Sequence, residues 1–222
     1  MKAIIHAKAV LPGRVLENAT ILLDGERIAA VGRDLTVPAG AEVLDAGGRW
    51  VGPGFVDIHL HGGGYDSWLN DPEAVAAYPL RHGSTTLVAY LGYDLSPADL
   101  LAATKRIQAA IDEGKLPNVT AIGYEGPYIN PHQGANSAAG GRSGPDEAEY
   151  TSHYEACHGH VAQWMYAPEL DRDGRFGTFL REHGVVAAVG HTEATPAQAA
   201  RYEAVLNGLD ATFGPHAEAG LY

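Results

Sequence analysis

The alternation of hydrophobic and polar positions changes character near residue 53. Before that point, short apolar runs are separated by turn residues, a pattern typical of strands in a hairpin-based sheet. The runs lie at 3–5, 19–23 and 27–31, and Asp24-Gly25 supplies a turn between the last two. Residues 1–52 are therefore predicted to form a small sheet of their own.

Beyond residue 53 the chain alternates between apolar runs and amphipathic stretches. The apolar runs lie at 55–59, 85–90, 119–124, 161–166, 185–189 and 209–213. Helices are expected at 72–82, 176–183 and 196–207, with another opened by Ser96-Pro97-Ala98-Asp99, which has the form of a capping box. The runs are apolar enough to be buried on both faces, as parallel strands are.

This rhythm of strands and helices favours an α/β fold over residues 53–222. It matches the beginning of a closed (β/α)₈ barrel, with two units fewer than such a barrel contains. An open six-stranded parallel sheet is the alternative, and it is less favoured because the first strand-to-helix turn has no glycine-rich nucleotide loop. The prediction is an incomplete (β/α) barrel of about six units, preceded by the small sheet of residues 1–52.

Composition narrows the range of partners and locations. The 222 residues are 45% hydrophobic and carry a formal net charge of −12, with a sequence pI near 5.2. We expect neither nucleic acid nor an anionic membrane as a partner, because no basic face could easily outweigh that charge. The sequence has no apolar run long enough to cross a bilayer, and its start breaks off at proline and glycine before a secretory core could form, so a cytoplasmic location is predicted. The single cysteine, Cys157, is expected to be a passive thiol.

Candidate ligands stand at the ends of three predicted strands. His59 and His61 occupy alternate positions, so a strand would send both imidazoles to the same face. Glu125 follows the run at 119–124, and His191 follows the run at 185–189. Because barrels build their sites at the carboxyl ends of their strands, these four side chains are expected to converge. Histidine nitrogens with a carboxylate oxygen suit zinc and similar ions, so the pattern predicts a site for one or two divalent ions, zinc before others.

Five short sequence motifs occur along the chain, and their order identifies a protein family better than any single motif does. They are PGFVDIHLHGG at 53–63, GSTTLVAYL at 83–91, EGPYINPHQGA at 125–135, APE at 167–169 and GHTEAT at 190–195. Together they resemble the N-acetylglucosamine-6-phosphate deacetylases of the amidohydrolase superfamily. That family joins a metal-bearing barrel to a small β-sandwich made from both ends of the chain, which implies that residues 1–52 are a sandwich portion.

The resemblance implies roles for the candidate ligands. Glu125 and His191 would bind metal, while His59 and His61 would hold a second ion or merely line the site. Many related amidohydrolases bridge two metals with a carbamylated lysine, but the last lysine here is Lys115, so Glu125 would bridge two ions or bind a single one. This departure fits the deacetylases and counts against a dihydroorotase or a hydantoinase.

The reaction implied by the resemblance is hydrolysis of the acetamide of N-acetylglucosamine 6-phosphate to glucosamine 6-phosphate and acetate. A metal-activated water would attack, and a carboxylate would carry its proton to the leaving amine. The family's catalytic aspartate ends the eighth strand, whereas this sequence ends at Tyr222, so no catalytic residue is assigned. Ala135 and Asn136 stand in the family's substrate-binding motif, and a homodimer is expected.

Departures from the family pattern leave other functions open. Phe213 stands where the family has a histidine at the end of the sixth strand, and Asn136 replaces a histidine of the substrate motif. The alternatives are a truncated or degenerate, non-catalytic relative and a deacetylase of another N-acetylated amino sugar.

The remaining histidines and aromatic residues are expected to be structural. His153, His158 and His160 follow the acidic stretch 145–150, which is typical of the start of a surface helix, so we expect them to be solvated. Core or rim positions are expected for Tyr124, Tyr128 and Trp164.

Overall fold

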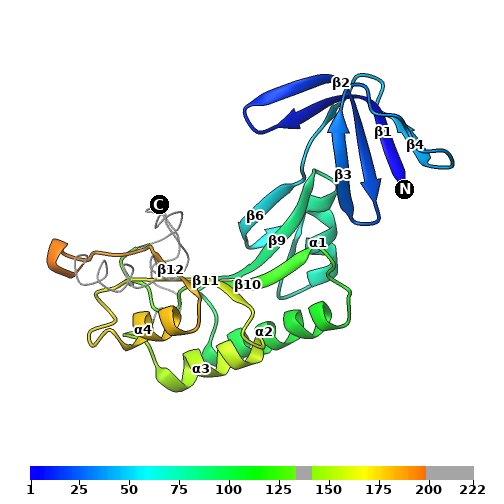
Figure 1. The fold of residues 1–222 in the computed structure, drawn as a ribbon. Coiled ribbons are helices and arrows are strands. Elements are labelled where there is room, and N and C mark those ends of the chain that lie inside the picture. The colour runs from blue at the N-terminus through cyan, green and yellow to red at the C-terminus, as the bar shows by residue number, and fades with distance from the viewer. Residues whose placement is uncertain (134–141, 199–222) are drawn as a thin grey trace. The chain divides into compact units, whose positions relative to one another are not determined.

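The computed structural model describes residues 1–133 and 142–198 (Figure 1). The chain packs as two compact units, of which the first is Met1–Gly54 and the second begins at Phe55. No helix within the described ranges is long and apolar enough to cross a membrane.

Unit 1 is a single sheet with a small core. Its strands are β1 (Lys2–Leu11), β2 (Arg14–Asp24), β3 (Arg27–Gly32), β4 (Glu42–Asp45) and β5 (Trp50–Val51). They run in the order β3-β2-β1-β4, with β5 also pairing with β1, and the first three strands are antiparallel. The predicted hairpin is confirmed, although its two turn residues are Gly25 and Glu26, because Asp24 already pairs with Arg27. Buried side chains of this unit's core are Ala7, Ala9, Ala19, Ile21 and Ala46.

Unit 2 alternates strands and helices at the places that the sequence predicts. The strands are β6 (Phe55–Leu60), β7 (Gly62–Gly63), β8 (Asp66–Ser67), β9 (Ser84–Leu91), β10 (Val119–Glu125), β11 (Val161–Tyr166) and β12 (Val186–Val189). The helices are α1 (Pro72–Leu80), α2 (Pro97–Asp112), α3 (Glu147–Ala156) and α4 (Arg175–Glu182). The run expected to form a sixth barrel strand, 209–213, lies outside the described residues, as does most of the helix expected at 196–207.

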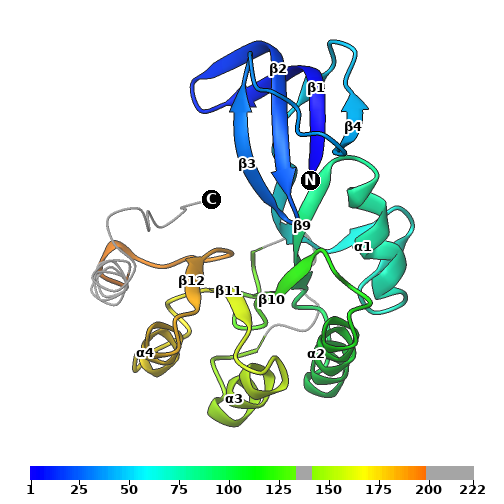
Figure 2. The same ribbon diagram turned by 45° about the vertical axis from the view of Figure 1, so that its right-hand side comes forward.

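The main sheet of unit 2 has the strand order of a barrel. Its order is β12-β11-β10-β9-β6, and every neighbouring pair is parallel. Strands of this sheet that follow one another along the chain are therefore neighbours in it, with only the separate β7-β8 pair between β6 and β9, whereas a doubly wound open sheet reverses direction partway. Figure 2 shows the helices α1 to α4 along the outer side of these strands, as in a (β/α) barrel. The described part of the unit is an incomplete (β/α) barrel.

Helix starts are set by local side-chain caps. The Oγ of Ser96 accepts a hydrogen bond from the backbone nitrogen of Asp99 at 3.2 Å, which confirms the predicted start of α2. Asp71 caps α1 and Asp146 caps α3 in the same way. These caps fix where each helix begins and therefore how the preceding loop leaves its strand.

Burial of the strands follows their place in the sheet. The last five residues of β9 are buried, and Tyr124, Tyr128 and Trp164 are fully buried core residues as expected. The expectation that all strands are buried on both faces is wrong for β6. There, Phe55 and Val56 are 70% and 63% exposed. The reason is that β6 is an edge strand among the described residues, hydrogen-bonded in this sheet to β9 alone.

Candidate metal centre

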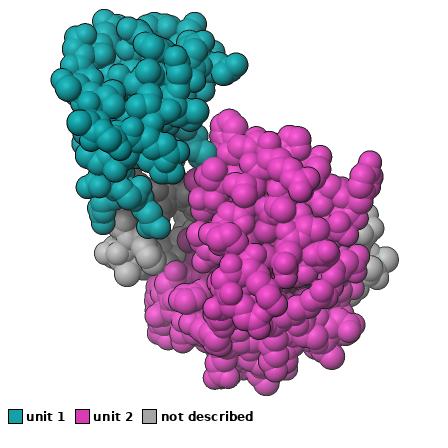
Figure 3. Space-filling view, turned by 90° about the vertical axis from the view of Figure 1, so that its right-hand side faces the viewer, with its two compact units in different colours: residues 1–54 teal, residues 55–222 magenta. Residues whose placement is uncertain are grey.

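Four side chains meet at the carboxyl ends of the parallel strands in unit 2, which is magenta in Figure 3. His59 belongs to β6 and His61 directly follows it, Glu125 ends β10, and His191 follows β12 by two residues. The sheet order puts these residues on every second strand. Alternate strands of a barrel send side chains into the same layer, which explains how residues so distant in sequence reach each other.

Glu125 is the centre of the group. Its Oε2 lies 2.7 Å from Nε2 of His61 and 3.7 Å from Nε2 of His59. Its Oε1 lies 2.5 Å from Nε2 of His191. The two strand histidines also face each other, with 3.0 Å between their Nε2 atoms. The structure thus brings together all four residues that the sequence singled out, and their role as ligands is a proposal developed below.

The protonation pattern of His61 makes this cluster suited to a cation. Nδ1 of His61 donates a hydrogen bond to the backbone carbonyl of Tyr90 at 3.1 Å, which leaves a lone pair on Nε2 in the neutral ring. That lone pair faces the carboxylate of Glu125, which is itself an acceptor. Two acceptors this close need a proton or a metal ion between them. Imidazole nitrogens and a carboxylate oxygen are a fitting donor set for a divalent ion such as zinc.

The charges in the cluster reinforce one another. The neighbouring imidazoles of His59 and His61 hold the pKa of the Glu125 carboxyl well below its usual range. The Glu125 carboxylate in turn raises the pKa of His61. Glu125 is therefore ionised at neutral pH, the form in which a carboxylate binds a metal.

Tyr90 supports the cluster from the neighbouring strand β9. The imidazole of His59 stacks on its ring, with 3.8 Å between centroids and 24° between planes. The Tyr90 hydroxyl donates to Oε1 of Gln163 on β11 at 2.9 Å, which fixes the ring. Gly123 makes room for it, since a Cβ at that position would overlap the tyrosine ring. Sequence reasoning missed Tyr90 because it lies inside an apolar run that predicts only a strand.

A cavity of about 310 Å³ opens beside the cluster. Its lining includes His61, Trp68, Tyr90, Tyr93, Asp94 and Glu125. This volume lies at the lower end of the range for small-molecule sites, and the lining combines aromatic rings with a few polar groups, as such sites do. The indole of Trp68 is held in place by a hydrogen bond from its Nε1 to the carbonyl of Leu60.

The other residues that the sequence singled out lie apart from the centre or outside the described ranges. Ala135 and Asn136 belong to the segment 134–141, which the structure does not describe. His158 is exposed as expected, but the prediction that His153 is solvated is wrong. Its side chain is 1% exposed, because α3 turns it toward the rings of Tyr124 and Trp164. Among the described residues neither ring nitrogen of His153 has a hydrogen-bond partner, and its Nε2 lies 3.9 Å from Oε1 of Glu149. Burial lowers the pKa of His153 to about 4.

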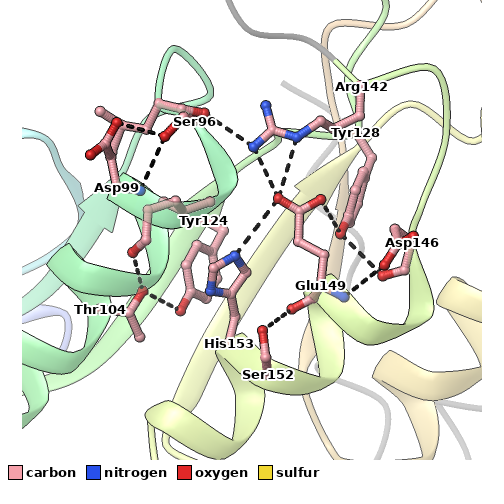
Figure 4. Close-up of polar contacts among 12 residues, drawn as sticks. Ser96, Asp99, Thr104, Tyr124, Tyr128, Arg142, Asp146, Glu149, Ser152 and His153 are labelled. Carbon is pink, nitrogen blue, oxygen red and sulfur yellow. Dashed lines mark hydrogen bonds and ion pairs between the residues drawn. The ribbon is translucent and has the colours of Figure 1, made fainter.

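A second polar cluster surrounds Glu149 on the same helix (Figure 4). Arg142 donates to Oε1 of Glu149 through both Nε and Nη2, and Tyr128 donates its hydroxyl proton to Oε2. Arg142 also donates to the carbonyl of Leu95, so it joins α3 to the loop that follows β9. This cluster is a structural tie with no counterpart in the sequence predictions.

Comparison with solved structures finds matches among N-acetylglucosamine-6-phosphate deacetylases. No protein-family model matches the chain. The crystal structure of N-acetyl-D-glucosamine-6-phosphate deacetylase from Mycobacterium smegmatis aligns with a TM-score of 0.78 and 32% sequence identity, over 92% of this chain and 58% of that one. The corresponding enzyme from Pasteurella multocida aligns with a TM-score of 0.75 over 92% of this chain and 54% of that one, and at 18% identity it supports the fold alone.

A match in sequence alone covers about half of the chain. Imidazolonepropionase from Streptomyces avermitilis is 33% identical over 117 residues, which are 51% of this chain and 28% of that protein. The chain spans little more than half the length of the deacetylase structures that it matches. It spans a smaller share, 28%, of the imidazolonepropionase.

Proposed function

We propose that this chain belongs to the N-acetylglucosamine-6-phosphate deacetylase family of the amidohydrolase superfamily and hydrolyses the acetamide of N-acetylglucosamine 6-phosphate. The products would be glucosamine 6-phosphate and acetate. One observation carries the proposal: His59, His61 and His191 converge on Glu125 in a fold that matches these deacetylases over 92% of the chain.

One or two divalent ions, zinc before others, would be held by His59, His61, Glu125 and His191. When bound, such an ion lowers the pKa of the attacking water and polarises the acetamide carbonyl. The two oxygens of Glu125 face different histidines, which supports a bridging role for this carboxylate. Tyr90 keeps the His61 tautomer that exposes a lone pair at Nε2, since its backbone carbonyl accepts the Nδ1 proton.

The cavity beside the cluster is the proposed place for part of the amino sugar. Trp68, Tyr90 and Tyr93 line this cavity, but each is at most 8% exposed, so they fix the shape of its wall and offer a sugar little of their ring faces. Asp94 adds an acceptor for a hydroxyl or an amine at the same wall. Ala135 and Asn136 are proposed as further substrate contacts, and a homodimer as the assembly.

We assign no proton-carrying base within the described residues, so two other functions are retained as outcomes of the test. A non-catalytic chain would keep the metal centre and release no acetate. A deacetylase of another N-acetylated amino sugar would release acetate faster from that sugar than from N-acetylglucosamine 6-phosphate.

The test is acetate release by the purified 222-residue chain with added zinc. We expect release from N-acetylglucosamine 6-phosphate, and loss of both the release and the bound zinc in Glu125→Gln. Glu182→Gln, which alters an exposed carboxylate on α4, is the matched control and should behave as the wild type. A folded, zinc-loaded wild-type chain that releases no acetate would contradict the proposed activity, and unchanged zinc content in Glu125→Gln would contradict the ligand assignment.

A further inference from the structure

One carboxylate, Glu169, ties together three loops beside the candidate metal centre. The loops follow β10, β11 and β12, and Glu169 belongs to the middle one. Its Oε1 accepts from the side-chain nitrogen of Asn130 at 3.0 Å and from the backbone nitrogen of Glu193 at 2.7 Å. Its Oε2 accepts from the hydroxyl of Thr192 at 2.5 Å. A single side chain thus fixes the loop of Asn130 against the residues that follow His191.

The backbone of His191 is held on both sides by this arrangement. The backbone nitrogen of Asn130 donates to the carbonyl of His191 at 2.9 Å, while Glu169 holds the next two residues. His191 has φ of +50°, in the left-handed region that residues other than glycine rarely adopt. A conformation of this kind persists where the surrounding structure fixes it, and such positions cluster at functional sites.

The backbone conformation of His191 sets the direction of its imidazole. A change of φ rotates Cβ about the chain, so relaxation toward the β region would swing the ring away from its present position. In the structure Nε2 of His191 contacts Oε1 of Glu125. The contact therefore depends on the hydrogen bonds that keep residue 191 left-handed.

An ionised carboxylate is the group that this junction requires. The side-chain amide of Asn130, the hydroxyl of Thr192 and the backbone nitrogen of Glu193 are all donors toward Glu169. A glutamine would keep its oxygen toward Asn130 and Glu193 but turn its amide toward the Thr192 hydroxyl, so it would lose both the charge and the hydrogen bond that Thr192 donates to Oε2. Burial alone would raise the pKa of Glu169, but these hydrogen bonds outweigh burial and hold it below its usual value.

We propose that Glu169 is a positioning residue that fixes the imidazole of His191 for metal binding. The inference rests on the proposed role of His191 as a ligand. Residues that orient a metal ligand without binding the metal themselves typically contribute to affinity, and their removal weakens metal binding by roughly 10- to 100-fold. Glu169 acts through the backbone around His191 and touches neither the metal nor the substrate.

The experiment is a titration of the full chain with Co²⁺ alone, followed by the visible absorption of the bound ion. The visible absorption of bound cobalt depends on how its ligands are arranged. A substitution that only lowers the stability of the fold would leave this spectrum unchanged. We expect Glu169→Gln to bind cobalt roughly 10- to 100-fold more weakly than the wild type, with an altered spectrum. Circular dichroism confirms that each variant is folded at the temperature of the titration.

The matched control is Glu193→Gln, a carboxylate in the same group of loops. Glu193 accepts from Gln133 and, at 3.4 Å, from Asn130, and it lies 3.6 Å from Nδ1 of His132; none of these side-chain contacts reaches the backbone of residues 191–193. We expect it to bind cobalt as the wild type does. Should Glu169→Gln fail to fold, Thr192→Val removes one hydrogen bond to the same carboxylate and should weaken cobalt binding to a smaller extent.

Any of four results would overturn the inference. Wild-type affinity and spectrum in folded Glu169→Gln would do so directly, and the same result in Thr192→Val would do so where that variant is used. Equal weakening in Glu193→Gln would show general loosening of the loops instead of positioning. Absence of cobalt binding by the wild type would remove the metal centre and this inference together, whereas acetate release, measured separately on the metal-loaded wild type, reports the proposed activity.

Discussion

Arg142 and Glu149 form an ion pair at 2.9 Å in which 17% and 10% of the two side chains remain exposed (Figure 4). Ion pairs on the surface contribute little to stability. In a largely buried pair such as this one, loss of one partner leaves the other charge buried and unpaired, which is strongly destabilising. The pair also joins α3 to the loops after β9 and β10, because Arg142 donates to the Leu95 carbonyl and its backbone nitrogen donates to the Pro127 carbonyl.

Removing one partner of this pair should destabilise the protein more than removing both charges. We expect Arg142→Met to lower the free energy of unfolding by about 3 to 5 kcal/mol, since it leaves the charge of Glu149 buried without its partner. Arg142→Met combined with Glu149→Gln should recover part of that loss. Urea unfolding of the two single variants and the double variant measures the coupling, and strictly additive losses would contradict it.

Burial of His153 should make the stability of the protein depend on pH. Its pKa of about 4 in the folded state lies below the value of about 6.5 in an unfolded chain. The unfolded state therefore binds the proton first as the pH falls, so stability is complete above pH 6.5 and declines toward pH 4. We expect the decline to be at most about 3 kcal/mol from this group.

His153→Leu tests that assignment. Leucine keeps the site apolar and removes the titrating group, so the variant should lose this part of the decline between pH 6.5 and pH 4. His158→Gln removes an exposed imidazole near the end of the same helix and serves as the control. An identical pH profile for wild type and His153→Leu, measured by urea unfolding, would refute the assignment.

The ring of Tyr90, and not its hydroxyl, should matter for the metal centre. Tyr90→Phe removes the hydrogen bond to Gln163 but keeps the ring that stacks on His59, so we expect a stability loss of about 1 kcal/mol and unchanged cobalt affinity. Gly123→Ala should weaken cobalt binding, because its methyl group displaces that ring. Cobalt titrations of the two variants distinguish the role of the ring from that of the hydroxyl. Weaker cobalt binding in Tyr90→Phe than in Gly123→Ala would show that the hydroxyl matters more than the position of the ring.

Asn136 should contribute to substrate binding alone. We expect Asn136→Ala to raise the Michaelis constant for N-acetylglucosamine 6-phosphate while leaving kcat and zinc content near their wild-type values. Steady-state acetate release across a range of substrate concentrations separates the two constants. An unchanged Michaelis constant would remove this residue from the proposed binding site.

Local pattern was sufficient for most of the fold and for the convergence of the ligands. Apolar runs and caps such as Ser96 act over a few residues, so the sequence predicts them well. The meeting of Glu125 with His191 also follows from a general rule, since parallel strands of a barrel end on one face. Each of these features depends on a short segment plus a known topology.

Features that depend on contacts between residues far apart in the sequence could not be predicted from it. The partners of Glu169 lie 39, 23 and 24 residues away, and nothing in the segment APE distinguishes its glutamate from a solvated one. His153 follows acidic residues typical of an exposed helix, and only the packing of α3 reveals that this ring is covered. The exposure of Phe55 likewise reflects the neighbours of β6 and not its composition.

The placement of the candidate ligands on β6, β10 and the end of β12 leaves the two intervening strands with a different task. Tyr90 on β9 and Gln163 on β11 are hydrogen-bonded to each other, and Tyr90 stacks on His59, although neither is offered as a ligand. The candidate ligands and the side chains that support them thus stand on separate strands. Substitutions in β9 and β11 can adjust the candidate ligands and the wall beside them without replacing any of those ligands, which gives one scaffold a route to different substrates.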